Sequence, residues 1–168
     1  MSVISRRRIP TDTYQKFYNL LSVQLTDPLS RSGPTKWIFS SYPEEDILEG
    51  AITYPIIIIE PADMLSEPHT QTKDKAMLNV GIEVHSNKMI QADQILTQLI
   101  SILDNFREDL KDQGLDKIQL ENTSTDFHLQ GGSRVHVRMV NYNMQHIFIS
   151  GKSTIRTQKT LTSSAVIA

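Results

Sequence analysis

The sequence predicts an α+β domain: a mostly antiparallel sheet of about four strands, with an N-terminal helix and one long helix packed on one face. Two features carry this prediction. The β-branched run Ile52–Glu60 is followed by the alternating segment Ala76–His85, and directly after that comes an amphipathic stretch from about Lys88 to Gln113. The expected order along the chain is helix, strand, strand, helix, strand, strand.

The first helix is predicted from Thr11, because Thr11 or Asp12 can cap its free amides. It ends before Asp27-Pro28, since proline removes a backbone donor and restricts the residue before it. Its apolar positions recur at helical spacing: Tyr14, Phe17, Tyr18, Leu21 and Leu25.

The segment Ala76–His85 alternates strictly between apolar and other residues, which is typical of a strand with one buried and one wet face. The expected buried face holds Ala76, Leu78, Val80, Ile82 and Val84. The long helix after it ends at Gly114, a residue suited to a helix C-terminus. Its apolar stripe is Ile95, Leu96, Leu99, Ile100, Ile102, Leu103, Phe106 and Leu110.

Two closing strands follow, Lys117–Asp126 and Arg134–Ser150, joined by a turn at Gly131-Gly132. In the first, Ile118 and Leu120 are expected to point inward. In the second, the apolar phase changes, from Val135, Val137 and Met139 to Val140, Tyr142 and Met144, and then to Ile147 and Ile149. Because a one-residue slip exchanges the two faces, this change predicts a bulge or bend near Met139–Asn143.

Three regions divide the chain: an N-terminal arm at 1–10, a single domain at 11–150 and a C-terminal extension at 151–168. Ser30–Glu49 is expected to be an irregular connection, with a short strand at Lys36–Ser40, and Pro61–Lys75 a second one. Long irregular connections in compact domains usually have a function. Here we expect them to reach a neighbouring protein.

Composition bounds the function. The chain has 168 residues, a net charge of −2 and no cysteine, which excludes disulfides and thiolate metal sites. It holds no apolar stretch long enough for a transmembrane helix, and its basic N-terminus lacks the apolar segment of a signal peptide. The balanced charge argues against general nucleic-acid binding. No membrane, cofactor or specific nucleic-acid partner is expected.

The histidines lack metal-binding spacing. His136 and His146 on the last strand could approach His85 on its neighbour, a set that would need more ligands to hold a metal. Exposed or interface histidines are therefore the expected outcome, and no metal site is predicted.

The one enzymatic hypothesis is a metal-dependent nuclease. Asp63 and Glu83 faintly resemble its paired carboxylates, which would bind Mg²⁺ from adjacent strand ends. His85 stands where that signature has lysine, and Asp63 lies in a proline-bounded segment. The sequence therefore favours a protein that is not an enzyme.

Charged groups provide the candidate interface. The basic arm holds Arg6, Arg7 and Arg8, and one face of the last strand holds Arg134, His136 and Arg138. The basic strand face could meet an acidic run of a second subunit, and it could equally be an exposed sheet face. That acidic run is Glu44, Glu45 and Asp46.

With this layout, the chain resembles the tail terminator (tail-completion) proteins of tailed bacteriophages and related viruses. The resemblance lies in the order of segments over residues 10–150. They are the helix Tyr14–Leu25, the run Ile52–Glu60, the strand Ala76–His85, the helix Met89–Leu110, and the strands Lys117–Asp126 and Arg134–Ser150.

The resemblance implies a structural virion protein without catalytic activity, located at the tail neck and assembled in the host cytoplasm. It implies a homohexameric ring that caps the tail tube, stops its polymerisation and meets head-completion or neck proteins. The expected partners are further copies of the chain and the tail tube protein, with the tail sheath protein as a further candidate and DNA passing through the lumen. The alternative is another head–tail connector or neck subunit.

Overall fold

The computed structural model describes residues 9–33, 37–43, 52–60, 63–68 and 73–149. Their helices and strands follow in this order: α1 (Ile9–Gln24), β1 (Ile38–Phe39), β2 (Ile56–Ile59), β3 (Asp63–Pro68), β4 (Lys73–Ser86), α2 (Met89–Asn105), α3 (Arg107–Asp112), β5 (Leu115–Gln130) and β6 (Ser133–Ile149). The expected α+β class is confirmed.

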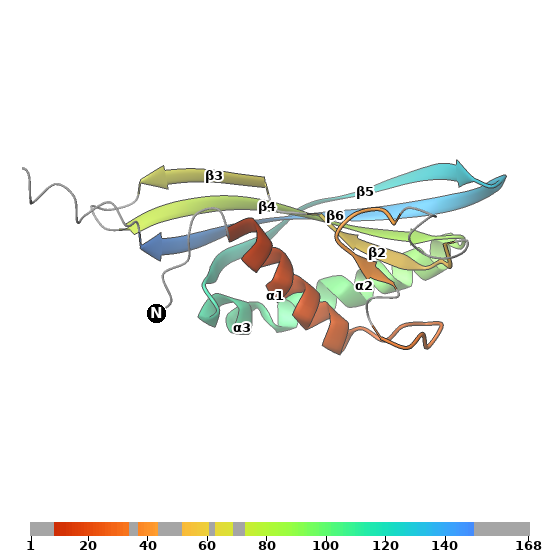
Figure 1. The fold of residues 1–168 in the computed structure, drawn as a ribbon, viewed down its shortest axis with the longest axis horizontal. Coiled ribbons are helices and arrows are strands. Elements are labelled where there is room, and N and C mark those ends of the chain that lie inside the picture. The colour runs from red at the N-terminus through yellow and green to blue at the C-terminus, as the bar shows by residue number, and fades with distance from the viewer. Residues whose placement is uncertain (1–8, 34–36, 44–51, 61–62, 69–72, 150–168) are drawn as a thin grey trace, which may run out of the picture.

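The six strands form one sheet in the order β1-β2-β4-β6-β5, and β3 pairs with β4 off this path. Only β1 and β2 run parallel; the other pairs are antiparallel. All three helices lie on one side of the sheet (Figure 1). The two strands beyond the four expected are β1, foreseen within Lys36–Ser40, and β3, which lies in a segment expected to be irregular.

Helix α2 forms because its apolar residues recur on one face, which covers the centre of the sheet. Its buried residues are Ala92, Ile95, Leu96, Leu99 and Leu103. The expectation of one helix to Gln113 was wrong: the backbone leaves helical geometry at Phe106, with φ −98° and ψ 16°, and α3 begins at Arg107. Leu110 of α3 is nevertheless buried, so the apolar stripe continues past the break.

Helix α1 begins at Ile9, two residues before the expected start. Pro10 is compatible with this, because the first turn of a helix has amides without an intrahelical partner. Phe17 and Leu21 are fully buried, while Tyr14 and Tyr18 pack at the margin of the core. None of the described helices is both long and apolar enough to cross a membrane.

The predicted bulge in the last strand was wrong. Strand β6 pairs with β4 without a register shift from Ser86↔His136 to Lys73↔Ile149. The irregularities lie in the partner strand β5, between Asp116 and Gln119 and between Leu120 and Asn122. The apolar phase changes because Val135 and Val137 face one side of the sheet and Val140, Tyr142 and Met144 face the other.

Strand β5 is largely exposed. Ile118 is buried as expected, but Leu120 is 42% exposed, so its predicted inward position was wrong. The two bulges of β5, at Asp116–Gln119 and Leu120–Asn122, meet next to these residues. They interrupt the regular alternation of inward and outward side chains on which the prediction depended. Beyond them, β5 and the N-terminal half of β6 form a long hairpin that extends away from α1 and α3 (Figure 1).

Candidate interaction surfaces

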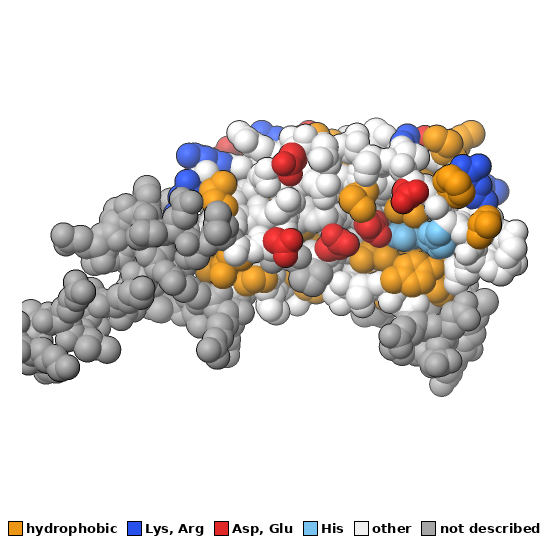
Figure 2. Space-filling model, turned by 90° about the horizontal axis from the view of Figure 1, so that it is seen from above, with side chains coloured by type: hydrophobic (Ala, Val, Ile, Leu, Met, Phe, Trp, Pro, Cys, Tyr) orange, Lys and Arg blue, Asp and Glu red, His pale blue; other side chains and the backbone are white. Residues whose placement is uncertain are grey.

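The side of the sheet opposite the helices forms an open face, which we define by Glu60, Asp63, Asn79, Gly81, Glu83, Asn141 and Asn143. Cross-strand pairing places them together, since Asp63 pairs with Asn79, Asn79 with Asn143, and Gly81 with Asn141. Directly paired residues share a face. Figure 2 shows this side, with acidic side chains across its middle and Lys and Arg toward its margins.

Glu60 lies at the centre of the acidic groups. A Cβ on Gly81 would lie 2.6 Å from Oε2 of Glu60, so the absence of a side chain at Gly81 makes room for this carboxylate. Burial raises the pKa of Glu60, and the charges of Glu83 and Asp63 raise it further. The open face is therefore a site where an incoming cation would relieve repulsion between carboxylates.

The nuclease hypothesis required Asp63 and Glu83 at adjacent strand ends. Asp63 instead pairs with Asn79, four residues before Glu83 on β4, a separation of roughly 13 Å along the strand. Across the described ranges, no group of three or more His, Asp or Glu residues is arranged to hold a metal ion. The two carboxylates share a face, but the structure does not bring them to one strand end.

An aromatic cluster of Tyr42, His85 and His128 lies on the same side of the sheet, toward the β5–β6 hairpin. The ring centroids are 5.4 Å apart for Tyr42 and His85, 5.8 Å for Tyr42 and His128, and 5.5 Å for the two histidines. Nε2 of His85 is 2.8 Å from Oε2 of Glu83. The Tyr42 hydroxyl donates to Oε1 of Gln130 at 2.8 Å, which ties the segment after β1 to the hairpin.

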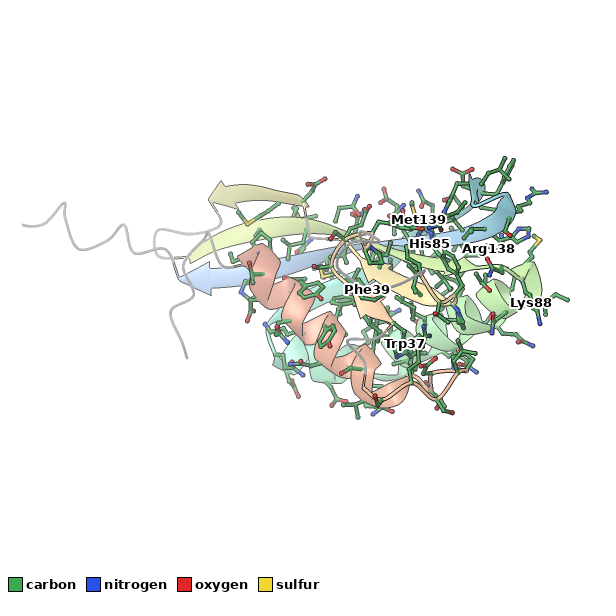
Figure 3. The ribbon with its side chains drawn as sticks, turned by 45° about the vertical axis from the view of Figure 1, so that its right-hand side comes forward. Trp37, Phe39, His85, Lys88, Arg138 and Met139 are labelled. Atoms are coloured by element: carbon green, nitrogen blue, oxygen red, sulfur yellow. The ribbon has the colours of Figure 1, made fainter. Side chains whose placement is uncertain are left out.

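Beside this cluster is a hollow of about 420 Å³. Its lining residues are Glu83, His85, Ser124, Thr125, Asp126, His128, Val137 and Met139. Figure 3 labels two of these lining residues, His85 and Met139, at this end of the sheet. Burial lowers the pKa of His128 and the charge of His85 lowers it further, while Asp126 and Glu83 act in the opposite direction.

The expectation of exposed histidines was wrong for His85 and His146, which are each 4% exposed. The possible approach of His136 and His146 to His85 does not occur. His136 pairs with Ser86, so it lies on the helix side of the sheet, opposite to His85. His146 is ten residues further along β6, where its Nδ1–H donates to the Gly114 carbonyl at 2.7 Å. His85 instead meets His128, which the sequence analysis did not consider.

Of the predicted interface residues, Arg134, His136 and Arg138 share the helix side of β6, toward the end of the hairpin. Arg138 contacts its own chain: Nε donates to the Asp93 carboxylate of α2, and Nη1 to the Thr125 hydroxyl of β5. Arg134 lies over the Phe127 ring, with its guanidinium carbon 3.9 Å from the ring centroid. The interface candidates Arg6, Arg7, Arg8, Glu44, Glu45 and Asp46 lie outside the described residues.

Phe127, Leu129 and Arg134 form a tip patch at the end of the hairpin. Leu129 pairs with Arg134 and Phe127 with His136, which places all of them on the helix side of the sheet. Phe127 is 51% exposed and Leu129 is 73% exposed. Two large apolar side chains and a stacked arginine on a projecting hairpin are a combination typical of protein contact sites.

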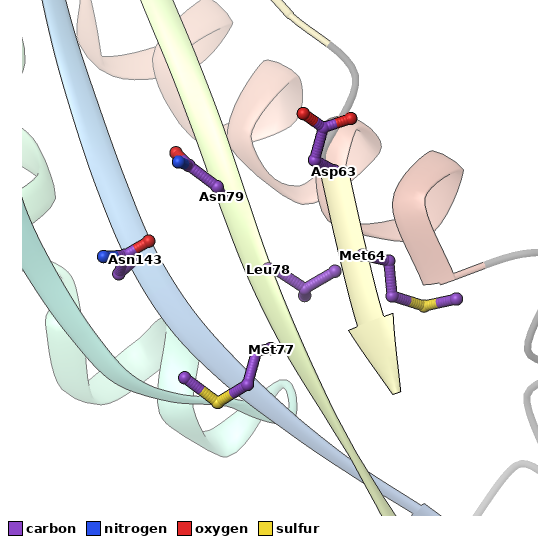
Figure 4. A pocket seen from close by; sticks show the side chains of 6 residues that line it. All are labelled: Asp63, Met64, Met77, Leu78, Asn79 and Asn143. Carbon is purple, nitrogen blue, oxygen red and sulfur yellow. The ribbon is translucent and has the colours of Figure 1, made fainter. Parts of the chain in front are cut away.

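A methionine hollow of about 420 Å³ lies further along the sheet, where β3 joins β4. It is lined by Asp63, Met64, Met77, Leu78, Asn79 and Asn143. Figure 4 shows the hollow along β4, with Asp63 on β3 to one side and Asn143 on β6 to the other. It combines apolar side chains with a carboxylate and two amides.

Sequence reasoning missed Tyr42, His128 and Glu60. Tyr42 lies in a connection expected to reach a neighbour, but Trp37–Pro43 folds back on its own sheet. The apolar residues Trp37 and Ile38 could have predicted this packing, and both are buried. His128 and Glu60 carried no local signal, because their proximity to His85 and Glu83 depends on strand register.

No protein-family model matches the sequence, and no curated protein matches it. A chain in a solved structure described as "Virion of native gene transfer agent (GTA) particle" is similar, with a TM-score of 0.43 and 10% sequence identity. The match covers 82% of this chain and 94% of that chain. A likeness at this level carries no argument about function.

Proposed function

We propose that this protein is a structural virion protein: a tail terminator that assembles into a ring, caps the tail tube and stops its polymerisation. The observation that carries the proposal is the sheet with helices on one side only, in the order that the resemblance requires. The first helix, strands β2 and β4, helix α2 and the closing β5–β6 hairpin follow in the predicted order, although β2 is shorter than expected and α2 ends at Asn105. The role needs no catalysis and no cofactor.

A closed ring of identical subunits needs a head-to-tail contact between two different surfaces. The chain offers such a pair. The open face is acidic around Glu60, and the hairpin end carries Arg134 with exposed Phe127 and Leu129. These opposite characters favour contact between copies with a fixed direction around a ring.

The edge strand β5 supplies a second kind of contact. Among the described strands β5 lies at one edge of the sheet, so the backbone groups of its outer side can pair with an extended segment of another protein. Bulges interrupt its first half, while pairing with β6 is regular from Asn122 to Gln130. The regular half is the part that we expect to meet tail tube or neck proteins.

The segments 30–49 and 134–150 are the proposed contact regions between subunits. Within them, Arg134 and His136 are the stronger candidates, because Arg138 is held by Asp93 of the same chain. The proposed partners are other copies of this chain, the tail tube protein, the head-completion or neck protein and the tail sheath protein. The proposed location is the neck of the virion tail.

The decisive experiment combines native mass spectrometry with negative-stain microscopy of the full chain, alone and with purified tail tubes. A six-subunit ring that binds one end of the tube and stops its growth is the expected result. Rings that ignore tubes but bind portal-proximal complexes would replace the terminator with a head–tail connector. Failure to bind either assembly would overturn the proposal, even if the free protein is a monomer.

A further inference from the structure

We propose that the tip patch of one copy, Phe127, Leu129 and Arg134, docks in the methionine hollow of the next copy. This inference builds on the proposed ring and names the two surfaces that meet in it. The occupant is a second copy of this chain, and four observations favour it: chemistry, electrostatics, position and orientation.

The chemistry of the two surfaces is complementary. The patch offers two exposed apolar side chains and one guanidinium. On the open side, the hollow offers Met77 as an apolar contact and Asp63 as an acceptor for the guanidinium, while Met64 and Leu78 face the helix side and form its floor. Methionine side chains adapt to an inserted aromatic ring and make favourable sulfur–aromatic contacts. Asn79 and Asn143 can satisfy polar groups that the contact would bury.

The electrostatics agree with this pairing. The hollow borders the acidic open face, where the charges of Asp63 and Glu83 already raise the pKa of Glu60. A guanidinium entering beside Asp63 would therefore also be attracted by Glu60, whose pKa the charge of Asp63 raises. Arg134 is carried by the hairpin and covers Phe127, so the cation and the aromatic ring would arrive as one unit.

Position excludes contact within one chain. Arg134 and Asn143 both lie on β6, nine residues apart, which is roughly 30 Å along a strand. The tip patch and the methionine hollow are therefore held apart by a continuous strand, which pairs with β4 from His136 onward. Only another molecule can bring the two surfaces together.

Orientation gives the contact a direction. Phe127 and Arg134 are on the helix side of the sheet, while Asp63, Asn79 and Asn143 are on the open side. A second copy bound on the helix side of the hairpin would turn its open face toward the tip patch. In a series of copies, the hairpin of each one would then cover the open face of the next. Such a contact is head-to-tail, and it closes when the rotation between copies divides a full turn.

Cysteine cross-linking tests the contact directly, because the natural chain has no cysteine. Two full-length variants, Leu129→Cys and Met77→Cys, are prepared with tags of different size, mixed and treated with a mild oxidant. We expect a mixed disulfide-linked dimer, formed about tenfold or more above the control through the raised local concentration of the two thiols. The matched control pairs Leu129→Cys with Val23→Cys, whose site on α1 is 77% exposed.

Reversing the charges of Arg134 and Asp63 provides a second test of the contact, which needs no cysteine. Arg134→Glu and Asp63→Arg should each weaken self-association about tenfold, because each places like charges against each other. The double variant restores opposite charges and should recover most of the lost association. Equal loss in the single and double variants would contradict a direct contact.

The outcomes separate this inference from the proposed function. Six-subunit rings without cross-linking above the control would overturn the docking contact and leave the terminator role standing. Cross-linking above the control, with no binding to tail tubes, would support the contact and overturn the terminator role. Cross-linking equal to the control in a sample without rings also overturns the docking contact.

Discussion

The imidazole rings of His85 and His128 lie with their centroids 5.5 Å apart, one on β4 and the other on β5, with β6 between these strands. Tyr42 closes the group from the segment after β1. His85 is 4% exposed, and among the described residues its Nδ1 has no hydrogen-bond partner. Burial and the charge of His85 disfavour protonation of His128, while Asp126 and Glu83 favour it to a smaller extent.

Acidification should destabilise the fold through His128. Its pKa lies below the usual 6.5, because burial and the charge of His85 disfavour the protonated form. As the pH falls below about 6.5, the unfolded chain binds a proton more readily than the folded chain, so folding free energy is lost. Urea unfolding at pH 7.5 and 5.5, followed by Trp37 fluorescence, should show lower stability at pH 5.5.

The variant His128→Gln tests the source of this effect, since glutamine does not titrate. Its stability should depend less steeply on pH between 7.5 and 5.5 than that of the natural chain. Some dependence should remain, because burial also lowers the pKa of His146, which contributes with the same sign. An unchanged slope would show that His128 is not responsible.

The buried hydroxyl of Tyr142 is a second polar group whose burial lowers the stability of the fold. Tyr142 is fully buried, and within the described part of the chain its hydroxyl has no hydrogen-bond partner. Burial raises its pKa to about 12, with a further contribution from Asp104, so the ring stays neutral over the ordinary pH range. Tyr142→Phe should therefore leave stability unchanged or raise it by up to about 1 kcal/mol.

A control for this experiment is Tyr142→Ala, which removes the ring as well. It should cost about 3 to 5 kcal/mol, the range for large buried side chains. Urea midpoints of the two variants against the natural chain provide the comparison. A loss above about 1 kcal/mol in Tyr142→Phe would show that the hydroxyl has a partner after all.

The core position Leu99 tests whether α2 holds the sheet as the structure shows. Leu99 is fully buried, and Leu99→Ala should lower the free energy of unfolding by about 2 to 5 kcal/mol. The neighbouring Gln98 is exposed, so Gln98→Ala should change it by less than about 0.5 kcal/mol. Thermal and urea unfolding of both variants measure the difference; similar losses would contradict the observed orientation of the helix.

The sequence predicted the elements with strong periodicity well. Strands β4 and β6, the turn at Gly131-Gly132 and the start of helix α2 appear where the pattern placed them, whereas α2 ends eight residues before the predicted Gln113. These signals are local, because the 3.6-residue and two-residue periods depend only on which face is buried. Strand β3 was not predicted because Asp63–Pro68 mixes polar and apolar residues without such a period.

Features that depend on register could not be predicted. The phase change in β6 looked like a bulge, because the pattern alone does not say that both faces of a strand are partly buried. The true bulges, in β5, fall among exposed polar residues where the pattern is silent. The same limit hid the pairing of Arg138 with Asp93, since nothing in the sequence relates a residue of α2 to one of β6.

The pair of Arg138 and Asp93 separates folding from assembly, because it holds Arg138 within its own chain. Arg138 and Asp93 are 25% and 40% exposed and join β6 to α2. Arg138→Ala should lower the free energy of unfolding by about 1 kcal/mol, and a double-mutant cycle with Asp93→Ala should give a coupling of about 0.5 to 1 kcal/mol.

Arg134→Ala loses its stacking on Phe127, so it should lower the free energy of unfolding by about 0.5 kcal/mol and also weaken self-association. Urea unfolding and native mass spectrometry of the same samples distinguish the two roles, and a change in assembly for Arg138→Ala with no loss of stability would reverse this assignment.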